Sequence, residues 1–191
     1  MDALARELGV DRKSLNYHLG GREGLLEAVA EDLFLAGLAE GDGAPASDWR
    51  AVLRSHGLAV LRGYLRAGSY SPYVSLSGTV ARAQLAHAET LLALLVDGGF
   101  DDQDAGRAVA LLTEYAFGAA MEMLLGRGRE QHPQRAELDV VIDDAGPDEL
   151  PVLRRILAGR TTYRDETDFA FALDVIVAGL EALLATSAGS A

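Results

Sequence analysis

The sequence predicts an all-α protein, and three observations lead to this fold class. No stretch alternates convincingly between apolar and polar residues with the period of two that a half-buried strand requires. Apolar residues instead recur three and four positions apart along several long stretches. Glycines, prolines and capping residues stand between these stretches, where helices are expected to begin and end. We therefore expect a bundle of about nine helices.

The predicted helices fall into two parts of the chain. In order, they lie at residues 4–8, 12–18, from 22 onward, 48–66, 79–97, 103–125, 147–158 and 166–185, with a short helical turn within 70–77. Small residues, glycine and proline at 41–47 predict a loop. We expect a first part at residues 1–40, a second at 47–186 and a disordered tail at 187–191. Residues 126–147 show no clear period and are expected to be irregular.

The stretch over residues 4–34 predicts a helix-turn-helix that runs into a third helix. Gly9 permits the sharp turn, because glycine adopts a positive φ without steric cost. Asp11 is the expected N-cap of the second helix, and Leu15 is its expected inward residue. Gly20 and its neighbouring glycine end that helix. The short second helix therefore has one side left to face another molecule.

The outer side of this second helix carries cations and hydrogen-bonding groups. No acidic residue occurs between Arg12 and Arg22, although the chain as a whole has a net charge of -12. Cations suit phosphates, whereas Ser, Asn, Tyr and His can bond phosphates or base edges in the major groove. The residues expected to contact double-stranded DNA are Arg12, Lys13, Ser14, Asn16, Tyr17, His18 and Arg22.

These residues stand in a pattern that resembles the tetracycline-repressor (TetR) family of transcriptional regulators. The pattern is LARELGV, four residues, the Leu-x-x-His of LNYHL, Gly-Gly-Arg and then Leu25-Leu26. The resemblance implies that the second helix reads operator DNA and that Arg22 touches phosphate. The family usually has Tyr where this chain has Asn16. It also has another helix before the motif, so a DNA-binding region that begins at Met1 is expected to lack its first helix.

Two functions follow from this pattern. The resemblance implies a ligand-responsive regulator, a repressor that binds operator DNA as a homodimer and is released by a small molecule. The alternative is a helical ligand-binding or scaffolding dimer without DNA-binding activity, because the family's first helix is missing.

Composition places the protein in the cytoplasm. The acidic residues lie mostly outside the helix-turn-helix, so an acidic body with a small basic tip is expected. There is no cysteine, and therefore no disulfide or thiolate chemistry. The sequence shows no uninterrupted apolar run of about 18 residues and no apolar N-terminal signal, so no membrane association is expected.

Several polar residues stand on the apolar faces of the middle helices, among them Thr113 and Glu114. Taken singly, each is better explained as a core or surface residue. Together they favour a ligand pocket, which is typically apolar with a few polar groups. The expected pocket residues are His56, Val60, Tyr64, His87, Leu91, Phe117, Met121 and Glu122, and the expected ligand is small and mainly apolar or aromatic.

The last long helix is expected to form the homodimer. Its most regular apolar face consists of Phe169, Leu173, Ile176, Leu180 and Leu184, and such a face needs a partner. The resemblance implies that this helix and the helix at 103–125 pair with their twofold mates in a four-helix bundle.

No catalytic or metal-binding pattern is visible. The four histidines have no metal-ligand spacing, and there is neither a nucleophile motif nor a phosphate-binding glycine loop. We expect no enzyme activity, no metal and no cofactor. In the alignment that the resemblance implies, Ser75 stands where the tetracycline-repressor subtype has a metal-chelating histidine. We therefore do not expect this protein to bind tetracycline with magnesium.

Overall fold

The computed structural model describes residues 1–41, 48–75, 78–129, 132–146, 148–159 and 165–188. These residues form helices without any strand, which confirms the predicted all-α class. The elements in order are α1 (Asp2–Leu8), α2 (Arg12–Leu19), α3 (Gly21–Leu38), the 3-10 helix η1 (Ala39–Gly41), α4 (Trp49–Ala67), the 3-10 helix η2 (Gly68–Tyr73), α5 (Gly78–Asp97), α6 (Asp102–Gly126), α7 (Pro133–Asp144), α8 (Pro151–Ala158) and α9 (Glu166–Ala188).

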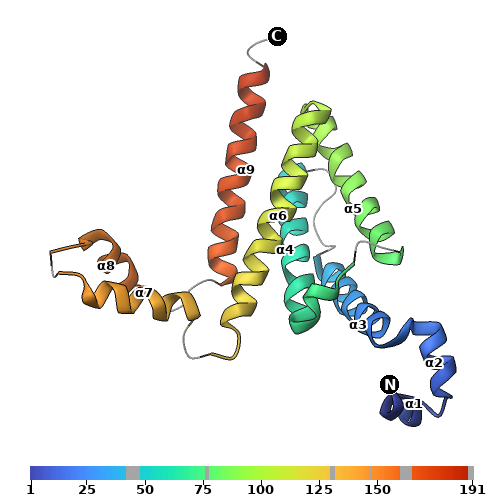
Figure 1. Cartoon of the computed structure of the whole chain (residues 1–191). Coiled ribbons are helices and arrows are strands. Elements are labelled where there is room, and N and C mark those ends of the chain that lie inside the picture. Colours follow the sequence, from blue (N-terminus) through green and yellow to red (C-terminus); the bar gives the residue numbers. More distant parts are fainter. Residues whose placement is uncertain (42–47, 76–77, 130–131, 147, 160–164, 189–191) are drawn as a thin grey trace.

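Helix α4 lies at the centre of the body, where it packs against α3, α6 and α9, and α5 covers α6 (Figure 1). The core between these helices includes Leu53 and Leu61 of α4, Leu112 of α6 and Phe169 of α9, which are all almost fully buried. Helices α1 and α2 project from the body at the far end of α3. The body is therefore a bundle around α4, with α3 as the link to the N-terminal helices.

Helices α3 and α4 cross at two glycines. A Cβ added to Gly37 would lie 2.6 Å from the Cα of Gly63, and one added to Gly63 would lie 2.9 Å from the ring of Phe34. The two backbones can approach this closely only because neither residue has a side chain. The crossing fixes the C-terminal part of α3 to the body.

The antiparallel pair α4 and α9 is flanked by a row of ion pairs. Arg54 lies 2.8 Å from Asp174, and Arg62 lies 3.4 Å from Glu166. A further pair joins Arg50 to Glu181. All these side chains are at least a third exposed, so each pair contributes little stability. The buried apolar faces hold the helices together, and the ion pairs are consistent with their register.

The prediction that residues 126–147 are irregular is wrong for most of this stretch, because residues 133–144 form α7. His132 caps this helix by accepting a hydrogen bond from the amide of Gln134, and Pro133 occupies its first turn. Helix α8 folds back on it: Arg154 donates to the carbonyls of Ile142 and Ala145. The two helices form an arm beside the body in Figure 1. Tertiary hydrogen bonds of this kind leave no periodic signal in a sequence.

Helix α9 continues to Ala188, so residues 187 and 188, which were expected to belong to a disordered tail, are helical. The remaining residues of that predicted tail, and residues 42–47 of the predicted loop, lie outside the described residues.

Candidate functional site

The N-terminal helix-turn-helix is built by caps that the sequence predicted. Gly9 ends α1 with a φ of 65°, and the Asp11 carboxylate accepts hydrogen bonds from the amides of Lys13 and Ser14 at 2.9 and 3.2 Å. Gly20 ends α2 with a φ of 68°. These left-handed glycines and this N-cap set the angle between the helices. As a result, α2 packs one side on α3 and presents the other to solvent.

The residues expected to bind DNA gather on the exposed side of α2 and at the start of α3. All are exposed except Asn16, which is half-buried. Tyr17 is 86% exposed and lies edge-on to the ring of His18, with 5.4 Å between the ring centroids. Arg12 forms an exposed ion pair with Asp2 at 2.9 Å. The structure therefore presents one polar surface to solvent, while Leu15 is half-buried.

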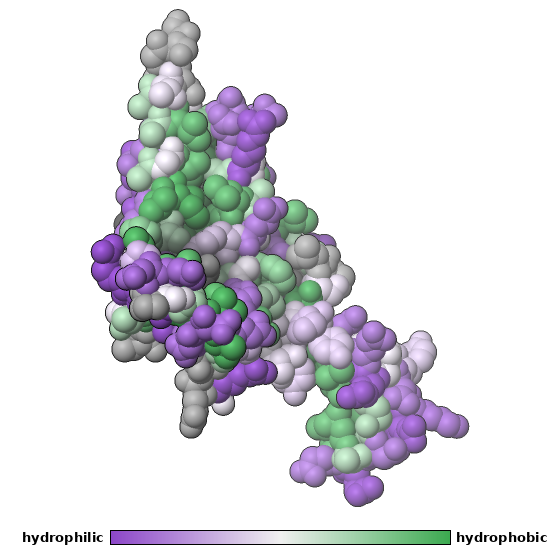
Figure 2. All heavy atoms as spheres, turned by 60° about the vertical axis from the view of Figure 1, so that its left-hand side comes forward, coloured by the Kyte–Doolittle hydropathy of each residue, from purple (hydrophilic) through white to green (hydrophobic). Residues whose placement is uncertain are grey.

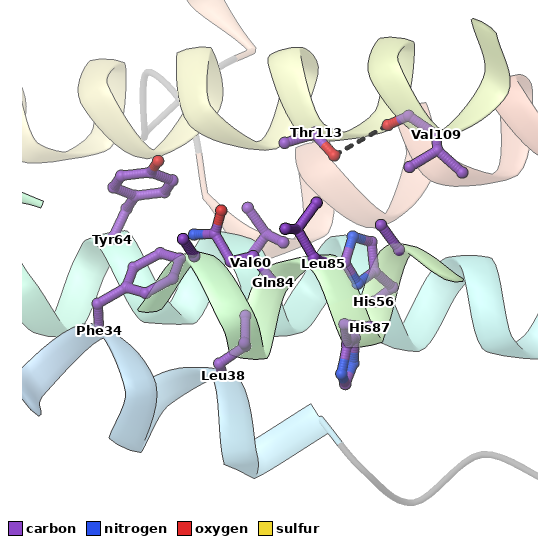
Figure 3. Close-up of a pocket in the computed structure, with 12 residues that line it drawn as sticks. Phe34, Leu38, His56, Val60, Tyr64, Gln84, Leu85, His87, Val109 and Thr113 are labelled. Atoms are coloured by element: carbon purple, nitrogen blue, oxygen red, sulfur yellow. Dashed lines mark hydrogen bonds between the residues drawn. The ribbon is translucent and has the colours of Figure 1, made fainter. Parts of the chain in front are cut away.

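A cavity of about 360 Å³ lies in the body between α3, α4, α5 and α6 (Figure 3). This volume is at the lower end of the usual range for small-molecule sites. Most of its wall is apolar. The lining side chains are Phe34, Leu38, His56, Val60, Tyr64, Ala81, Gln84, Leu85, His87, Ala88, Val109 and Thr113.

Half of the residues expected in the pocket line this cavity, namely His56, Val60, Tyr64 and His87. The structure places the other four elsewhere. Leu91 is 2% exposed within the core, and Phe117 is 45% exposed and lies edge-on to Tyr64, with 5.0 Å between the ring centroids. The sulfur of Met121 accepts a hydrogen bond from the hydroxyl of Ser71, on η2, at 3.8 Å. Of the described residues of α6, Val109 and Thr113 line the cavity, so the cavity follows the N-terminal half of this helix.

Glu122, the fourth of these residues, lies beside His132 instead of the cavity. Its Oε2 is 3.7 Å from the His132 Nε2, and the same nitrogen lies 3.2 Å from the Glu122 carbonyl oxygen. The His132 Nδ1 accepts from the amide of Gln134, so the Nε2 carries the proton and donates. This pair joins the end of α6 to the start of the arm, a structural role that the sequence analysis missed.

Sequence reasoning also missed the contribution of α3 to the cavity. Phe34 and Leu38 occupy positions i and i+4 on that helix, and both are buried. They continue the apolar stripe of α3 by one more turn, and this periodicity in the sequence could have predicted that they face the body. On α6, Thr113 and Val109 line the wall, and the Thr113 hydroxyl donates to the Val109 carbonyl at 2.9 Å.

Two histidines, His56 and His87, belong to the polar part of the cavity wall, together with Tyr64, Gln84 and Thr113. His56 is 8% exposed, and its ring stacks on that of His87 at 5.2 Å between centroids and 29° between planes. Burial, and to a smaller extent the neighbouring His87, lowers the pKa of His56 to about 4. Burial also raises the pKa of the Tyr64 phenol. His56 and Tyr64 are therefore uncharged at neutral pH.

The face of α9 that was expected to form a dimer packs into the chain's own core. Phe169 and Leu173 are each 1% exposed and Leu180 is 5% exposed, so they have almost no surface to offer a partner. Ile176 and Leu184 are half-buried. That assignment is corrected: the helix is apolar on two sides, and the more regular side faces inward.

The opposite side of α9 is apolar and exposed. Phe171 is 72% exposed, Val175 56% and Leu183 54%, and on the neighbouring α6 Leu111 and Leu125 are each about half exposed. Figure 2 shows hydrophobic surface along the C-terminal helix. Both helices are long and apolar enough to cross a membrane by length and composition, a test that core and interface helices of soluble proteins also pass. These two helices therefore present a candidate interface.

Comparison with known proteins agrees with this architecture. Residues 42–184 match the family model described as "Tetracyclin repressor-like, C-terminal domain". The class C tetracycline repressor protein of Escherichia coli is 26% identical over 192 residues, which cover 96% of this chain and 82% of that protein.

Solved structures share the fold. One is a possible TetR family transcriptional regulator from Streptomyces coelicolor A3(2), with a TM-score of 0.72 and 22% identity over 95% of this chain and 88% of that one. Another is the TetR family protein ActR from the same organism in complex with actinorhodin, with a TM-score of 0.70 and 20% identity over 96% and 87% of the two chains.

Among the described residues, no group of three or more His, Cys, Asp or Glu side chains could hold a metal ion. The match to the family covers most of the chain, and the class C repressor aligns over the helix-turn-helix as well as the body. The chain therefore belongs to the tetracycline-repressor-like family and is a ligand-responsive transcriptional regulator.

Proposed function

We propose that the protein is a homodimeric repressor that binds operator DNA through α2 of each protomer and leaves it when a small molecule enters the cavity. The observation that carries this proposal is that one helix, α3, belongs to both sites. Phe34 and Leu38 of α3 line the cavity. The other end of α3 carries Arg22 and packs against α2.

Helix α3 is long enough to transmit a displacement from the cavity to the DNA surface. Its 18 residues correspond to about 27 Å at 1.5 Å per residue. A ligand that shifts Phe34 or Leu38 would therefore move α2 relative to the body. The ligand must bind the shifted state more tightly than the DNA-binding state, because otherwise the equilibrium does not change.

The exposed apolar side of α9 and α6 supports the proposed homodimer. A C₂ pairing of these two helices with their mates would cover Phe171, Val175 and Leu183. It would also place two copies of α2 on one DNA molecule. Two half-sites one helical turn apart, about 34–36 Å, would then meet the two reading helices.

The ligand of this regulator is proposed to be small and mainly apolar or aromatic. The mostly apolar wall supports this class, and the related ActR was solved with actinorhodin. The protein is proposed to act in the cytoplasm. The alternative of a dimer without DNA-binding activity is not favoured, because similarity to the class C repressor extends over 96% of the chain.

A gel-shift experiment tests this proposal. The full chain should bind a labelled fragment from upstream of its own gene, and unlabelled fragment should compete better than unrelated DNA of the same length. Specific binding typically exceeds non-specific binding by a factor of about 10³ or more. Equal competition by the two DNAs would contradict the proposed operator binding.

A further inference from the structure

One of the residues that line the cavity, His56, carries a buried hydrogen-bonding atom that the protein leaves without a partner. The Nδ1 of His56 is buried and has no hydrogen bond within the protein. The residue as a whole is only 8% exposed, so solvent has little access to it. An unpaired polar atom in an apolar environment destabilises the protein, and a ligand that bonds it recovers that cost. This atom therefore points to a hydrogen bond with a molecule in the cavity.

The described residues of the wall around this atom carry no permanent charge. Among the described lining residues, α3 contributes Phe34 and Leu38 and α6 contributes Val109 and Thr113, none of which titrates. The titratable groups on the wall are His56 and Tyr64 of α4 and His87 of α5, and no Asp, Glu, Lys or Arg lies among the described residues of the wall.

A charged ligand would be poorly compensated at this wall. Its charge would lose hydration without meeting an opposite charge, which is costly in an apolar site. Protonation of His56 could meet an anion only against the cost of burying the imidazolium beside the stacked His87 ring. A neutral imidazole, in contrast, offers one donor and one acceptor to an uncharged group.

We infer that the cavity binds an uncharged ligand with an apolar body, and that a hydroxyl or amide of this ligand is hydrogen-bonded to the Nδ1 of His56. This inference deepens the proposed function and rests on it for the role of the cavity. A hydroxyl satisfies the Nδ1 in either tautomer of the ring, because it can donate or accept, and an amide does so through its N–H or its carbonyl oxygen. The ligand's remaining surface packs on Leu38, Val60 and Leu85.

Four probes with one ring system test the chemical class. They are 2-naphthol, 2-methylnaphthalene, 2-naphthoate and 2-naphthylmethylammonium, titrated into the full chain at pH 7 without DNA and followed by naphthalene fluorescence. We expect 2-naphthol to bind about tenfold more tightly than the other three, since one satisfied buried hydrogen bond corresponds to roughly that factor. Tighter or equal binding of either charged probe, or of the methyl probe, would overturn the inference, as would the failure of 2-naphthol to bind.

Three variants assign the preference to His56. His56→Leu should reduce the ratio between 2-naphthol and 2-methylnaphthalene to about one, whereas His56→Gln, which keeps a donor and an acceptor, should retain a preference. His87→Leu makes the same change on the adjacent ring and should leave the ratio near its wild-type value. An unchanged ratio in His56→Leu contradicts the inference. If circular dichroism shows that His56→Leu does not fold, the inference is tested by the ranking of the four probes in the wild type and by the preference that His56→Gln retains.

The outcome is separable from that of the proposed function. These titrations contain no DNA, so they report the cavity alone. A clear preference for 2-naphthol in a protein that fails the gel shift would sustain the ligand class and refute the repressor. A protein that binds operator DNA but prefers 2-naphthoate would sustain the repressor and refute the ligand class.

Discussion

His56 makes the stability of the fold depend on pH. Its pKa falls from 6.5 to about 4 in the folded protein, so between these values the unfolded chain binds more protons than the folded one. The free energy of unfolding should therefore decrease as the pH falls from 6.5 to 4, by about 3 kcal/mol for the full shift. Urea denaturation of the wild type and of His56→Gln over this range measures the difference. Parallel pH profiles for the two proteins would show that His56 is not buried in its neutral form.

Arg22 and Asn16 should contribute differently to DNA binding. Arg22 is exposed at the start of α3, where it can reach a phosphate, so Arg22→Ala should weaken binding to all sequences alike. It should also reduce the slope of log K against log salt by about 0.9. Asn16→Ala should instead change the ranking of base-substituted operators, which fluorescence anisotropy can measure. Identical, salt-dependent losses in both variants would argue against base reading by Asn16.

At the scale of elements, the crossing of α3 and α4 should tolerate no side chain at Gly37. Gly37→Ala would place a Cβ 2.6 Å from the Cα of Gly63, and a backbone atom cannot move aside as a flexible side chain can. We expect the free energy of unfolding to fall by about 1–3 kcal/mol.

Gly106→Ala is the matched control for this prediction. A Cβ at Gly106 meets nothing within 4 Å, so this helical substitution should be neutral or stabilise by up to about 1 kcal/mol. Thermal denaturation of both variants gives the comparison. A Gly37→Ala variant as stable as Gly106→Ala would mean that the helices do not cross at this distance.

The elements that local signals specify could be predicted from the sequence. Gly9, Asp11 and Gly20 act within one or two residues, and their caps formed where the sequence placed them. Helix α7 was missed although its cap His132 and Pro133 are local signals, because its hydrogen bonds with Arg154 are set by the folded hairpin.

The candidate site was predictable only in part, for a similar reason. His56 and Val60 were found because they repeat on one face of α4, but how far the cavity extends along α6 depends on how α3, α4, α5 and α6 pack together. On α9, the stripes of Leu173 and Val175 are both apolar. Hydrophobic periodicity cannot say which of the two faces the chain's own core.

At the scale of the whole molecule, the two sides of α9 should respond differently to a charge. Val175 is 56% exposed on the side proposed to pair with a second copy, so Val175→Glu should give a folded monomer. Leu173 is 1% exposed in the chain's own core, so Leu173→Glu should unfold the protein by burying an unpaired charge. Light scattering and circular dichroism separate these results. Folded monomer from Leu173→Glu, with Val175→Glu still dimeric, would restore the face predicted from sequence.

Coupling between the cavity and the DNA surface is what would let a ligand regulate DNA binding. If a ligand weakens DNA binding by a given factor, DNA must weaken ligand binding by the same factor. Couplings of this kind typically amount to about 1–3 kcal/mol, or about 5- to 150-fold in affinity. The shared helix α3 is the element whose position both partners would bias.

The most direct test of this coupling is a fluorescence anisotropy titration of labelled upstream DNA, performed with and without a saturating compound that calorimetry shows to bind the cavity. The account predicts that the compound weakens DNA binding at least fivefold. It also predicts that Arg22→Ala binds the compound with wild-type affinity while its DNA affinity falls. A compound that occupies the cavity and leaves the DNA affinity unchanged would contradict the account.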